Sequence, residues 1–380
     1  MAPSTLSLLL ALLAVPVFVG GVWAIARRHH GIEAAAFELG LAVLIGVGQL
    51  AVVLAVGGNN FDAMSVVYLD VVVALPLIAL ILLLGGLVGR RWGLPRLGRV
   101  ASILAVLVLV ALPLFGFYAT HVEPYAVSVD RASLALPAER SGDDVIRVGV
   151  LTDLQTTEIG GYERRAVRLL QEERPDIVFV CGDLFQGTPG QFAANREALR
   201  DLFTGIDAPG GVYVVQGDTD DGPTLAELFA GTSVTYLWNQ VVDTQVADRR
   251  VRIAGLGLGR GREGRAALAE LTAAPPTTVR LALTHRPDWI TEVPGTPGAV
   301  DLMVAGHTHG GQIQLPLIGP LMTLTDVPRD VAAGGLHDIE GTPIYVSHGV
   351  GHEQQGAPQI RFLAPPDVGL IELGVADLSS

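Results

Sequence analysis

The stretch Asp301–Gln312 reads DLMVAGHTHGGQ, an apolar run that ends in two histidines two positions apart, with glycines on both sides. A short apolar run that is bounded by glycine is typical of a buried β-strand. The turn after such a strand requires neither His307 nor His309. Two imidazoles at a strand end therefore suggest a binding site, and other parts of the chain must supply the rest of it.

Four other apolar runs are also followed directly by polar residues. They are VGVLTDLQ, VFVCGDL, VYVVQGDTD and LALTH, and they deliver Asp153, Gln155, Asp183, Asp218, Thr219, Asp220 and His285. Helical patterns such as YERRAVRLLQEER alternate with several of these runs, which predicts a layered α/β domain. Sites in such folds assemble at the carboxyl ends of strands, so we expect these side chains to converge. Carboxylate, imidazole and amide groups together suit Mn, Fe, Zn or Mg ions.

Each of these residues also has an ordinary structural interpretation. An aspartate after a strand commonly caps a helix or closes a turn. A lone histidine is more often a satisfied core or surface residue than a ligand. Because the same pattern recurs at five strand ends, the sequence favours a metal site over five unrelated turns.

The first 120 residues have a different character. Apolar stretches occupy Ser4–Ile25, Ala34–Val56, Ser65–Leu87 and Val100–Tyr118, and the mean hydropathy of the whole chain is +0.46. Each stretch has roughly the 20 residues that a helix needs to cross the ~30 Å hydrocarbon layer. We therefore predict a four-helix transmembrane region over 1–120, a linker with an edge strand over 121–144 and a globular domain over 145–380.

Arginine placement predicts the orientation of these spans. The loops after the first and third stretches contain Arg27, Arg28, Arg90, Arg91, Arg96 and Arg99, whereas the N-terminus and the loop GGNNFDA contain none. Loops rich in arginine stay on the cytoplasmic side. We therefore expect a multi-pass protein of the cell membrane whose globular domain is extracytoplasmic.

Charge and composition exclude some classes of function. The net charge of −13 argues against binding to nucleic acid, which requires a basic face. The single cysteine, Cys181, excludes an intrachain disulfide. Glu38 and Asp70 lie within apolar stretches and leave a channel or transporter as an alternative function.

Taken together, the motifs TDLQ, GDL, GDTD, TH and GHTHGGQ resemble those of the calcineurin-like metallophosphoesterases. The pattern of that family is D-x-H, G-D, G-N-H-D/E, H and G-H-x-H. The tail IYVSHGVG…IRFLAPPDVGLIEL is similar to the bacterial membrane-associated branch of the family. The resemblance covers nearly the whole chain after residue 121. It implies a two-sheet β-sandwich flanked by helices, with a site that bridges two metal ions.

Position by position, the resemblance implies two sets of ligands. Asp153, Gln155, Asp183 and His309 would surround one ion, and Asp183 would bridge to a second ion held by Asp218, His285 and His307. The implied activity is hydrolysis of phosphomonoesters, phosphodiesters or pyrophosphates with two divalent ions, which are Mn, Mg, Fe or Zn, with Mn favoured. The expected substrate is a small phosphoester or a lipid-linked one.

Three positions depart from the family pattern. Gln155 replaces the histidine of D-x-H, which makes one site richer in oxygen ligands and favours Mn²⁺ or Mg²⁺. Asp218 replaces an asparagine and adds a negative charge. Thr219 replaces the histidine that protonates the leaving group, so Asp220 would have no imidazole to orient. Loss of such an acid typically costs ~10²–10⁴-fold in rate.

Two consequences follow from the missing acid. His348 or His352 in the tail could replace it, so the expected catalytic residues are Asp183, Thr219, Asp220 and His348. Without a replacement, the enzyme should favour substrates with good leaving groups, such as pyrophosphates. The alternative is a catalytically weakened or inactive binding or scaffold protein that retains metal.

Overall fold

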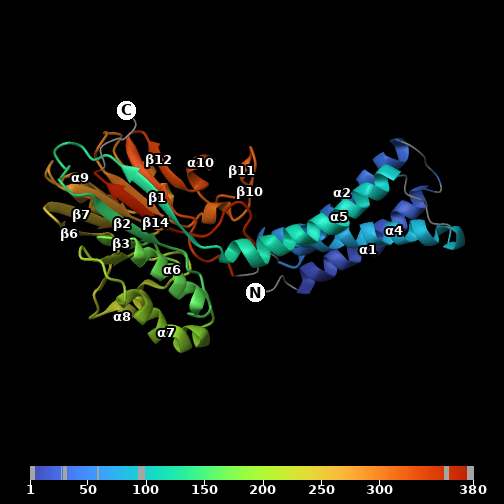
Figure 1. Ribbon diagram of the computed structural model, residues 1–380, viewed down its shortest axis with the longest axis horizontal. Coiled ribbons are helices and arrows are strands. Elements are labelled where there is room, and N and C mark those ends of the chain that lie inside the picture. The colour runs from blue at the N-terminus through green and yellow to red at the C-terminus, as the bar shows by residue number, and fades with distance from the viewer. Residues whose placement is uncertain are drawn as a thin grey trace. The chain divides into compact units, whose positions relative to one another are not determined.

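The computed structural model describes residues 5–26, 28, 32–57, 60–92, 99–354 and 359–374 (Figure 1). The chain forms two compact units, Met1–Val122 with Glu353–Gln359, and Glu123–His352 with Ile360–Ser380. Ser4, Arg27, Arg96 and residues 58–59 of the GGNNFDA loop, which enter the prediction of spans and orientation, lie outside the described residues.

The first unit is helical. Its elements are α1 (Thr5–Ala26), α2 (Ile32–Ala55), α3 (Asn60–Leu69), a π-helical turn (Asp70–Ala74), α4 (Leu75–Trp92), α5 (Arg99–Phe117) and a second π-helical turn (Tyr118–Val122). Four stretches are long and apolar enough to cross a membrane, namely Thr5–Ile25, Ala36–Ala55, Asp62–Gly85 and Val100–Tyr125. This confirms the prediction of four apolar helices. Many leucines and valines of these helices are exposed, as expected for side chains that face lipid.

A polar contact lies inside the third of these stretches. Asp70 accepts a hydrogen bond of 3.0 Å from the side-chain amide of Gln49 on α2. A polar group within an apolar helix needs such a partner, because hydrocarbon offers none. This pair therefore has a structural role in joining two helices.

The second unit contains two six-stranded sheets. The first has the order β1 (Ser128–Leu134), β14 (Asp367–Leu373), β2 (Ile146–Leu151), β3 (Ile177–Val180), β4 (Val212–Val214), β5 (Val234–Tyr236). The second has the order β12 (Gly335–Ile339), β13 (Thr342–Val346), β9 (Leu302–Ala305), β8 (Val279–Leu283), β7 (Arg249–Gly255), β6 (Gln240–Val246). A separate hairpin pairs β10 (Gln314–Leu315) with β11 (Gly319–Pro320).

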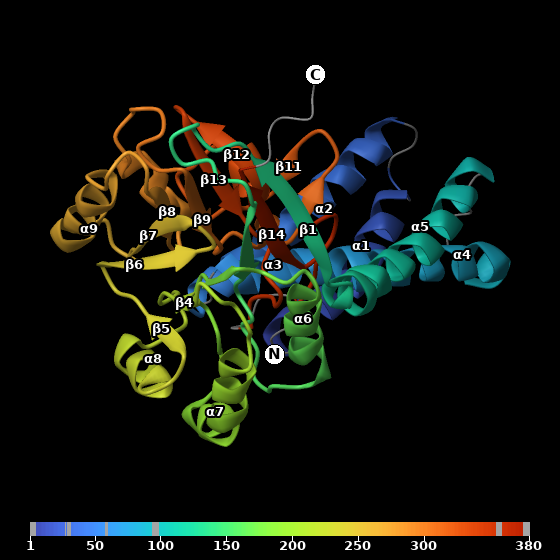
Figure 2. The ribbon, with the colours of Figure 1, turned by 60° about the vertical axis from the view of Figure 1, so that its left-hand side comes forward.

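Helices cover the outer faces of both sheets (Figure 2). The first sheet is covered by α6 (Gly161–Glu172), α7 (Pro189–Thr204) and α8 (Gly222–Phe229), and the second by α9 (Arg262–Thr272), the 3₁₀ segment Pro287–Glu292 and α10 (Arg329–Ala332). Side chains such as Phe179 of β3 and Leu281 of β8 meet between the sheets. The central strands are buried on both faces, so their sequences are continuously apolar instead of alternating. The prediction of a two-sheet sandwich flanked by helices is confirmed.

The strand directions bring five loops to one edge of the sandwich. β2, β3 and β4 are parallel in the first sheet, and β8, β9 and β13 are parallel in the second. The register pairs Leu151 with Val180 and Val180 with Val214, so these strands end side by side. In the second sheet, Ala305 pairs with Val346 in the same way. The polar residues that follow the strands therefore start from neighbouring positions.

Candidate metal centre

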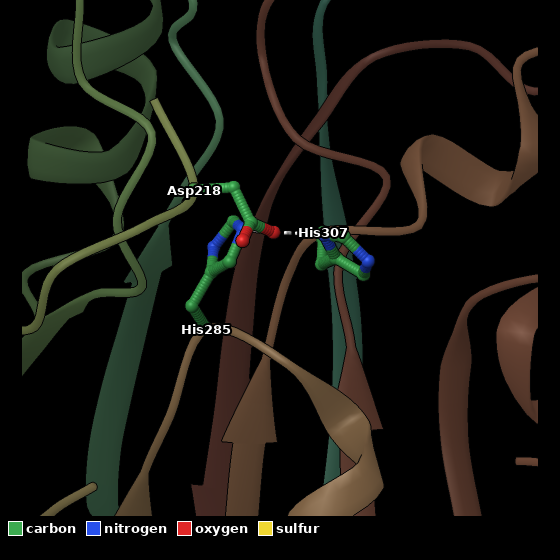
Figure 3. Close-up of side chains that lie close together, drawn as sticks. All are labelled: Asp218, His285 and His307. Carbon is green, nitrogen blue, oxygen red and sulfur yellow. Dashed lines mark ion pairs between the residues drawn. The ribbon is translucent and has the colours of Figure 1, made fainter. Parts of the chain in front are cut away.

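Predicted ligands from both sheets meet at this edge. One group, here called the histidine cluster, consists of Asp218, His285 and His307 (Figure 3). A second group, the carboxylate cluster, consists of Asp153, Asp183 and His285. In each group the candidate ligand atoms lie within 4.8 Å of one another. His285 belongs to both, so the two clusters are continuous.

In the histidine cluster, both rings direct one nitrogen at Asp218. The Oδ2 atom of Asp218 lies 3.0 Å from Nδ1 of His307 and 3.4 Å from Nε2 of His285. The other nitrogen of each ring faces a backbone carbonyl. Nδ1 of His285 lies 2.7 Å from the Cys181 oxygen, and Nε2 of His307 lies 3.1 Å from the Leu324 oxygen. Because a carbonyl only accepts, each ring keeps one proton on that side, and the nitrogen that faces Asp218 is the one that would bind a metal ion in place of a proton.

The environment of His285 fits a cation. Its Nε2 atom is buried and makes no hydrogen bond to any residue that the structure describes. This atom lies 3.5 Å from Oδ2 of Asp183 as well as near Asp218. Burial opposes a charge on the ring, but the charges of Asp183, Asp218 and Asp153 raise the pKa of His285 to about 10. A proton or a metal ion at this point would neutralise the same carboxylates, so the residues fit a divalent ion.

Asp183 belongs to the carboxylate cluster, and its Oδ2 lies 3.5 Å from Nε2 of the shared His285. Its Oδ2 accepts a hydrogen bond of 3.0 Å from the Gln155 side-chain amide, and its Oδ1 accepts one of 2.8 Å from the Thr219 backbone. Gln155, a predicted ligand of the first ion, is thus buried beside Asp183 with its amide nitrogen toward the carboxylate. One oxygen of Asp183 thus faces the loop of Gln155 and the other faces the loop of Thr219. A carboxylate that bridges two ions needs two oxygens that point in different directions.

Asp153 is fully buried and held by the histidine loop. The backbone amide of His307 lies 3.2 and 3.1 Å from its two oxygens, and Thr152 donates a hydrogen bond of 2.6 Å. Burial raises the pKa of Asp153 to about 6. A Cβ atom at position 306 would collide with Oδ2 of Asp153, so Gly306 allows the two loops to approach this closely.

His309 differs from the other two histidines. Its Nε2 lies 3.6 Å from Oδ1 of Asp153, while its Nδ1 lies 3.3 Å from the guanidinium of Arg361. Burial, together with the charge of Arg361, lowers the pKa of His309 well below its usual value, so the ring is neutral. Because Arg361 can only donate, the ring proton lies on Nε2 and points at Asp153. In this arrangement the lone pair of His309 faces Arg361 instead of the carboxylates.

Several of these residues have a left-handed backbone. The φ angles are 50° at Asp153, 35° at Gln155, 55° at Asp183, 72° at His307 and 49° at His309. Each such residue costs on the order of 1–3 kcal/mol, and strain of this kind concentrates at functional sites. The loops are therefore held in a geometry that the rest of the fold imposes.

Asp220 and Thr219 support Asp183 from the neighbouring loop. The Asp220 carboxylate accepts hydrogen bonds from the backbone amides of Asp183 (2.7 Å), Leu184 (2.9 Å) and Gly217 (2.9 Å). Desolvation, together with the charge of Asp183, raises the pKa of Asp220 to about 6. The hydroxyl of Thr219 makes no hydrogen bond to a described residue. Asp220 thus binds backbone amides of both ligand loops in place of a histidine ring.

His348, the predicted substitute for the missing acid, has both ring nitrogens occupied. They lie 2.9 Å from the Pro365 oxygen and 2.7 Å from the Ala333 oxygen. The residue lines a separate cavity of about 410 Å³, together with Asp130 and Asp367. Both ring nitrogens are therefore directed at backbone carbonyls and not at the metal centre.

Two arginines at the site were not among the predicted residues. Arg286 forms a two-point ion pair with Asp218, in which Nε lies 3.1 Å from Oδ2 and Nη2 contacts Oδ1. Burial opposes the charge of Asp218, but the nearby side chains of His285, His307 and Arg286 hold its pKa far below the usual value. Arg361 is fully buried and donates to the carbonyl oxygens of His348 (2.8 Å) and Ala364 (2.9 Å). Two features of the sequence could have pointed to these arginines. Arg286 directly follows the predicted ligand His285, and Arg361 belongs to the IRFLAPP segment.

A two-sheet sandwich with an aspartate and histidine centre at the strand ends defines a metallophosphoesterase-type domain. Residues 146–311 match the family model of the calcineurin-like phosphoesterases. These residues therefore form a calcineurin-like phosphoesterase domain, which confirms the resemblance seen in the sequence. The same chain carries the four apolar helices that precede it.

Three curated proteins illustrate the similarity. The uncharacterized metallophosphoesterase YkuE of Bacillus subtilis is 26% identical over 67% of this chain and 88% of its own length. The phosphodiesterase YaeI of Escherichia coli is 28% identical over 55% of this chain and 74% of its own. The UDP-2,3-diacylglucosamine pyrophosphatase LpxG of Chlamydia trachomatis is 23% identical over 70% of this chain and 94% of its own.

Proposed function

We propose that this protein is a membrane-anchored phosphoesterase that depends on two divalent metal ions, with Mn²⁺ favoured. The observation that carries the proposal is Nε2 of His285, a buried ring nitrogen that has no hydrogen-bond partner among the described residues and lies between Asp183 and Asp218. Asp183, Asp218, His285 and His307 would hold one ion. Asp153, Gln155, Asp183 and His309 would hold the other. Bound ions would polarise the phosphoryl oxygens and lower the pKa of a water molecule.

The two ions should differ in affinity. His285 and His307 already direct the nitrogen that would bind the ion at Asp218, so neither side chain of the histidine cluster has to turn. Gln155 and His309 instead direct protons at Asp183 and Asp153. The Gln155 amide must turn over, and the His309 ring must move its proton, before either can act as a ligand. We therefore infer one tight ion and one looser ion.

The side chains around the site favour substrates whose leaving group departs without being protonated. Thr219 has a hydroxyl that cannot act as a general acid near neutral pH. His348 donates toward backbone carbonyls instead of the site. Arg286, which is about half exposed beside Asp218, is placed to neutralise charge on a phosphoryl group. Pyrophosphates and aryl phosphodiesters are thus the preferred substrate class, and LpxG is named as a pyrophosphatase.

The membrane location sets which substrates are within reach. The arginine distribution around the spans favours an extracytoplasmic domain, where lipid-linked and envelope phosphoesters occur. Small phosphoesters and lipid-linked ones are both compatible with the site.

The test uses the full chain in nanodiscs, loaded with Mn²⁺. Hydrolysis of bis-p-nitrophenyl phosphate and of a nucleotide diphosphate is measured together with the metal content per chain. Asp183→Asn should abolish turnover and metal binding, whereas the exposed control Asp143→Asn should retain both. One tightly held ion without turnover of either substrate would favour the binding or scaffold alternative and reject the enzyme.

A further inference from the structure

The β10–β11 hairpin and its flanks present an apolar surface. Residues 313–324 read IQLPLIGPLMTL and contain no charged side chain. Leu317 is fully exposed, and Ile318, Leu321 and Leu324 are each more than half exposed. Among the described residues of this unit, the other exposed large apolar side chains are Tyr125, Trp238 and Leu363, which lie apart in the sequence. Clusters of this kind on a soluble surface mark interaction sites.

The tip of the hairpin is a fixed turn. β10 pairs with β11 through Gln314 with Pro320 and Leu315 with Gly319, and the amide of Ile318 donates to the Leu315 oxygen at 3.1 Å. Leu317 has a φ of 68°. Residues other than glycine disfavour this left-handed conformation, because their Cβ atom crowds the backbone. Glycine or asparagine would suit this turn better, yet the position presents a leucine to the solvent. Local backbone preference therefore does not explain the residue.

Both ends of the hairpin are attached to the metal loop. The segment begins directly after GHTHGGQ, and a Cβ atom at Gly311 would lie 2.5 Å from Cβ of Pro320. At the other end, the Leu324 oxygen accepts the proton of His307 Nε2 at 3.1 Å. Whatever contacts the hairpin is consequently held beside the histidine cluster.

We propose that the hairpin 313–324 inserts its apolar tip into a lipid bilayer, which places the metal centre at the lipid–water interface. The same chain has four helices that are long and apolar enough to cross a membrane, so a bilayer is the apolar partner that its own sequence supplies. The surface is a protruding tip with few polar groups for a protein partner, and its Gln314 amide already donates to the Ala333 oxygen. The aliphatic part of Arg329 lies beside Gly319, so a basic group borders the apolar tip as in interfacial segments.

This location also defines the substrate class, a step that rests on the proposed phosphoesterase function. A metal centre at the interface would act on amphiphilic phosphoesters whose acyl chains remain in the bilayer. The head group would reach the ions while the chains stay beside Leu317 and Ile318. Such a substrate would not have to leave the membrane.

The insertion is tested without any activity measurement. Cys181 is fully buried, so Leu317→Cys gives a single accessible site for an NBD fluorophore on the full chain in phosphatidylcholine nanodiscs. Ala193→Cys on the exposed face of α7 is the matched control. We expect doxyl-labelled phosphatidylcholine to quench the label at position 317 at least about threefold more strongly than the label at position 193.

Two results would overturn the insertion. Equal weak quenching at both positions would show that the hairpin faces water. A blue-shifted label at position 317 that doxyl lipid does not quench would show burial against protein instead.

A second measurement separates the substrate class from the function itself. Ile318→Asp and the matched Ile318→Ala are compared on diacylglycerol pyrophosphate in the nanodisc and on bis-p-nitrophenyl phosphate in solution. We expect Ile318→Asp to lower the ratio of lipid to soluble turnover about tenfold relative to Ile318→Ala; an unchanged ratio would reject the substrate class. Quenching without any turnover would reject the proposed function alone, and soluble turnover without quenching would reject the insertion alone.

Discussion

The ring of His285 joins the two sheets, since its Nδ1 lies 2.7 Å from the carbonyl oxygen of Cys181 beyond the end of β3. That hydrogen bond holds the ring so that Nε2 is directed at Asp183 and Asp218. The position of Cys181 therefore matters through its backbone, while its thiol is buried and its pKa is raised by burial. A predicted metal ligand in one sheet is thus oriented by the main chain of the other.

Replacing His285 should impair both metal clusters at once. We expect His285→Asn to weaken Mn²⁺ binding by more than about 100-fold, since even partners of a ligand contribute 10–100-fold. Isothermal titration of the full chain measures the change. His337→Asn is the control, because its ring contacts the Gly334 oxygen and no predicted ligand. Tight binding that survives in His285→Asn would place the ion elsewhere.

If Asp218 binds an ion as proposed, Arg286 would compete with that ion for the carboxylate. Removing it in Arg286→Gln eliminates a positive charge next to the ion, so metal affinity should rise about tenfold, which corresponds to ~1.4 kcal/mol. Turnover should fall at the same time, because a donor to the phosphoryl group is lost. Metal titration and kcat are measured on the same preparation.

The control for Arg286 is a second arginine with the same type of partner. Arg265 forms a two-point ion pair with Glu292 on the surface, so Arg265→Gln should leave metal affinity and kcat unchanged. A fall in metal affinity in Arg286→Gln would show that the arginine positions Asp218 instead of competing for it.

Asp220 should be important for stability. In Asp220→Asn, an amide NH₂ group replaces an acceptor of backbone N–H groups of Asp183, Leu184 and Gly217. Leaving a buried donor without its acceptor costs about 1–3 kcal/mol, so the metal-free protein should unfold at a lower temperature. Calorimetry in nanodiscs gives the shift, with Asp143→Asn as the surface control. A melting temperature equal to that of the control would contradict this role.

A substitution at Thr219 tests whether the absence of a general acid at this position limits the turnover rate. Thr219→His should raise kcat by about 10²-fold on an alkyl phosphodiester, whose leaving group needs a proton. The effect on bis-p-nitrophenyl phosphate should be small, because p-nitrophenolate leaves without one. The comparison of the two substrates is the measurement, and Thr219→Asn serves as a polar control without an acid. A uniform change on both substrates would point to altered metal binding.

Local sequence was sufficient for the fold class and for the location of the site. The four apolar helices follow from hydropathy and length alone, which are properties of consecutive residues. The strand-end motifs followed from apolar runs that stop at Asp or His, and parallel strands necessarily end at one edge. Both inferences depend on neighbours in the chain, so no tertiary information was needed.

Tertiary structure decided the role of each polar group. Asp220 binds backbone amides, Arg286 pairs with Asp218, and Arg361 turns the proton of His309 toward Asp153. Leu184 beside Asp220, Asp218 beside Arg286 and His309 beside Arg361 are 36 or more positions away in the chain from those partners. Sequence spacing does not say how close two such residues lie in space. A hydrogen bond depends on tenths of an ångström and on which group donates. Sequence therefore determined which chemical groups gather at the strand ends, and only the packing of the two sheets decided which of them can offer a lone pair to a metal.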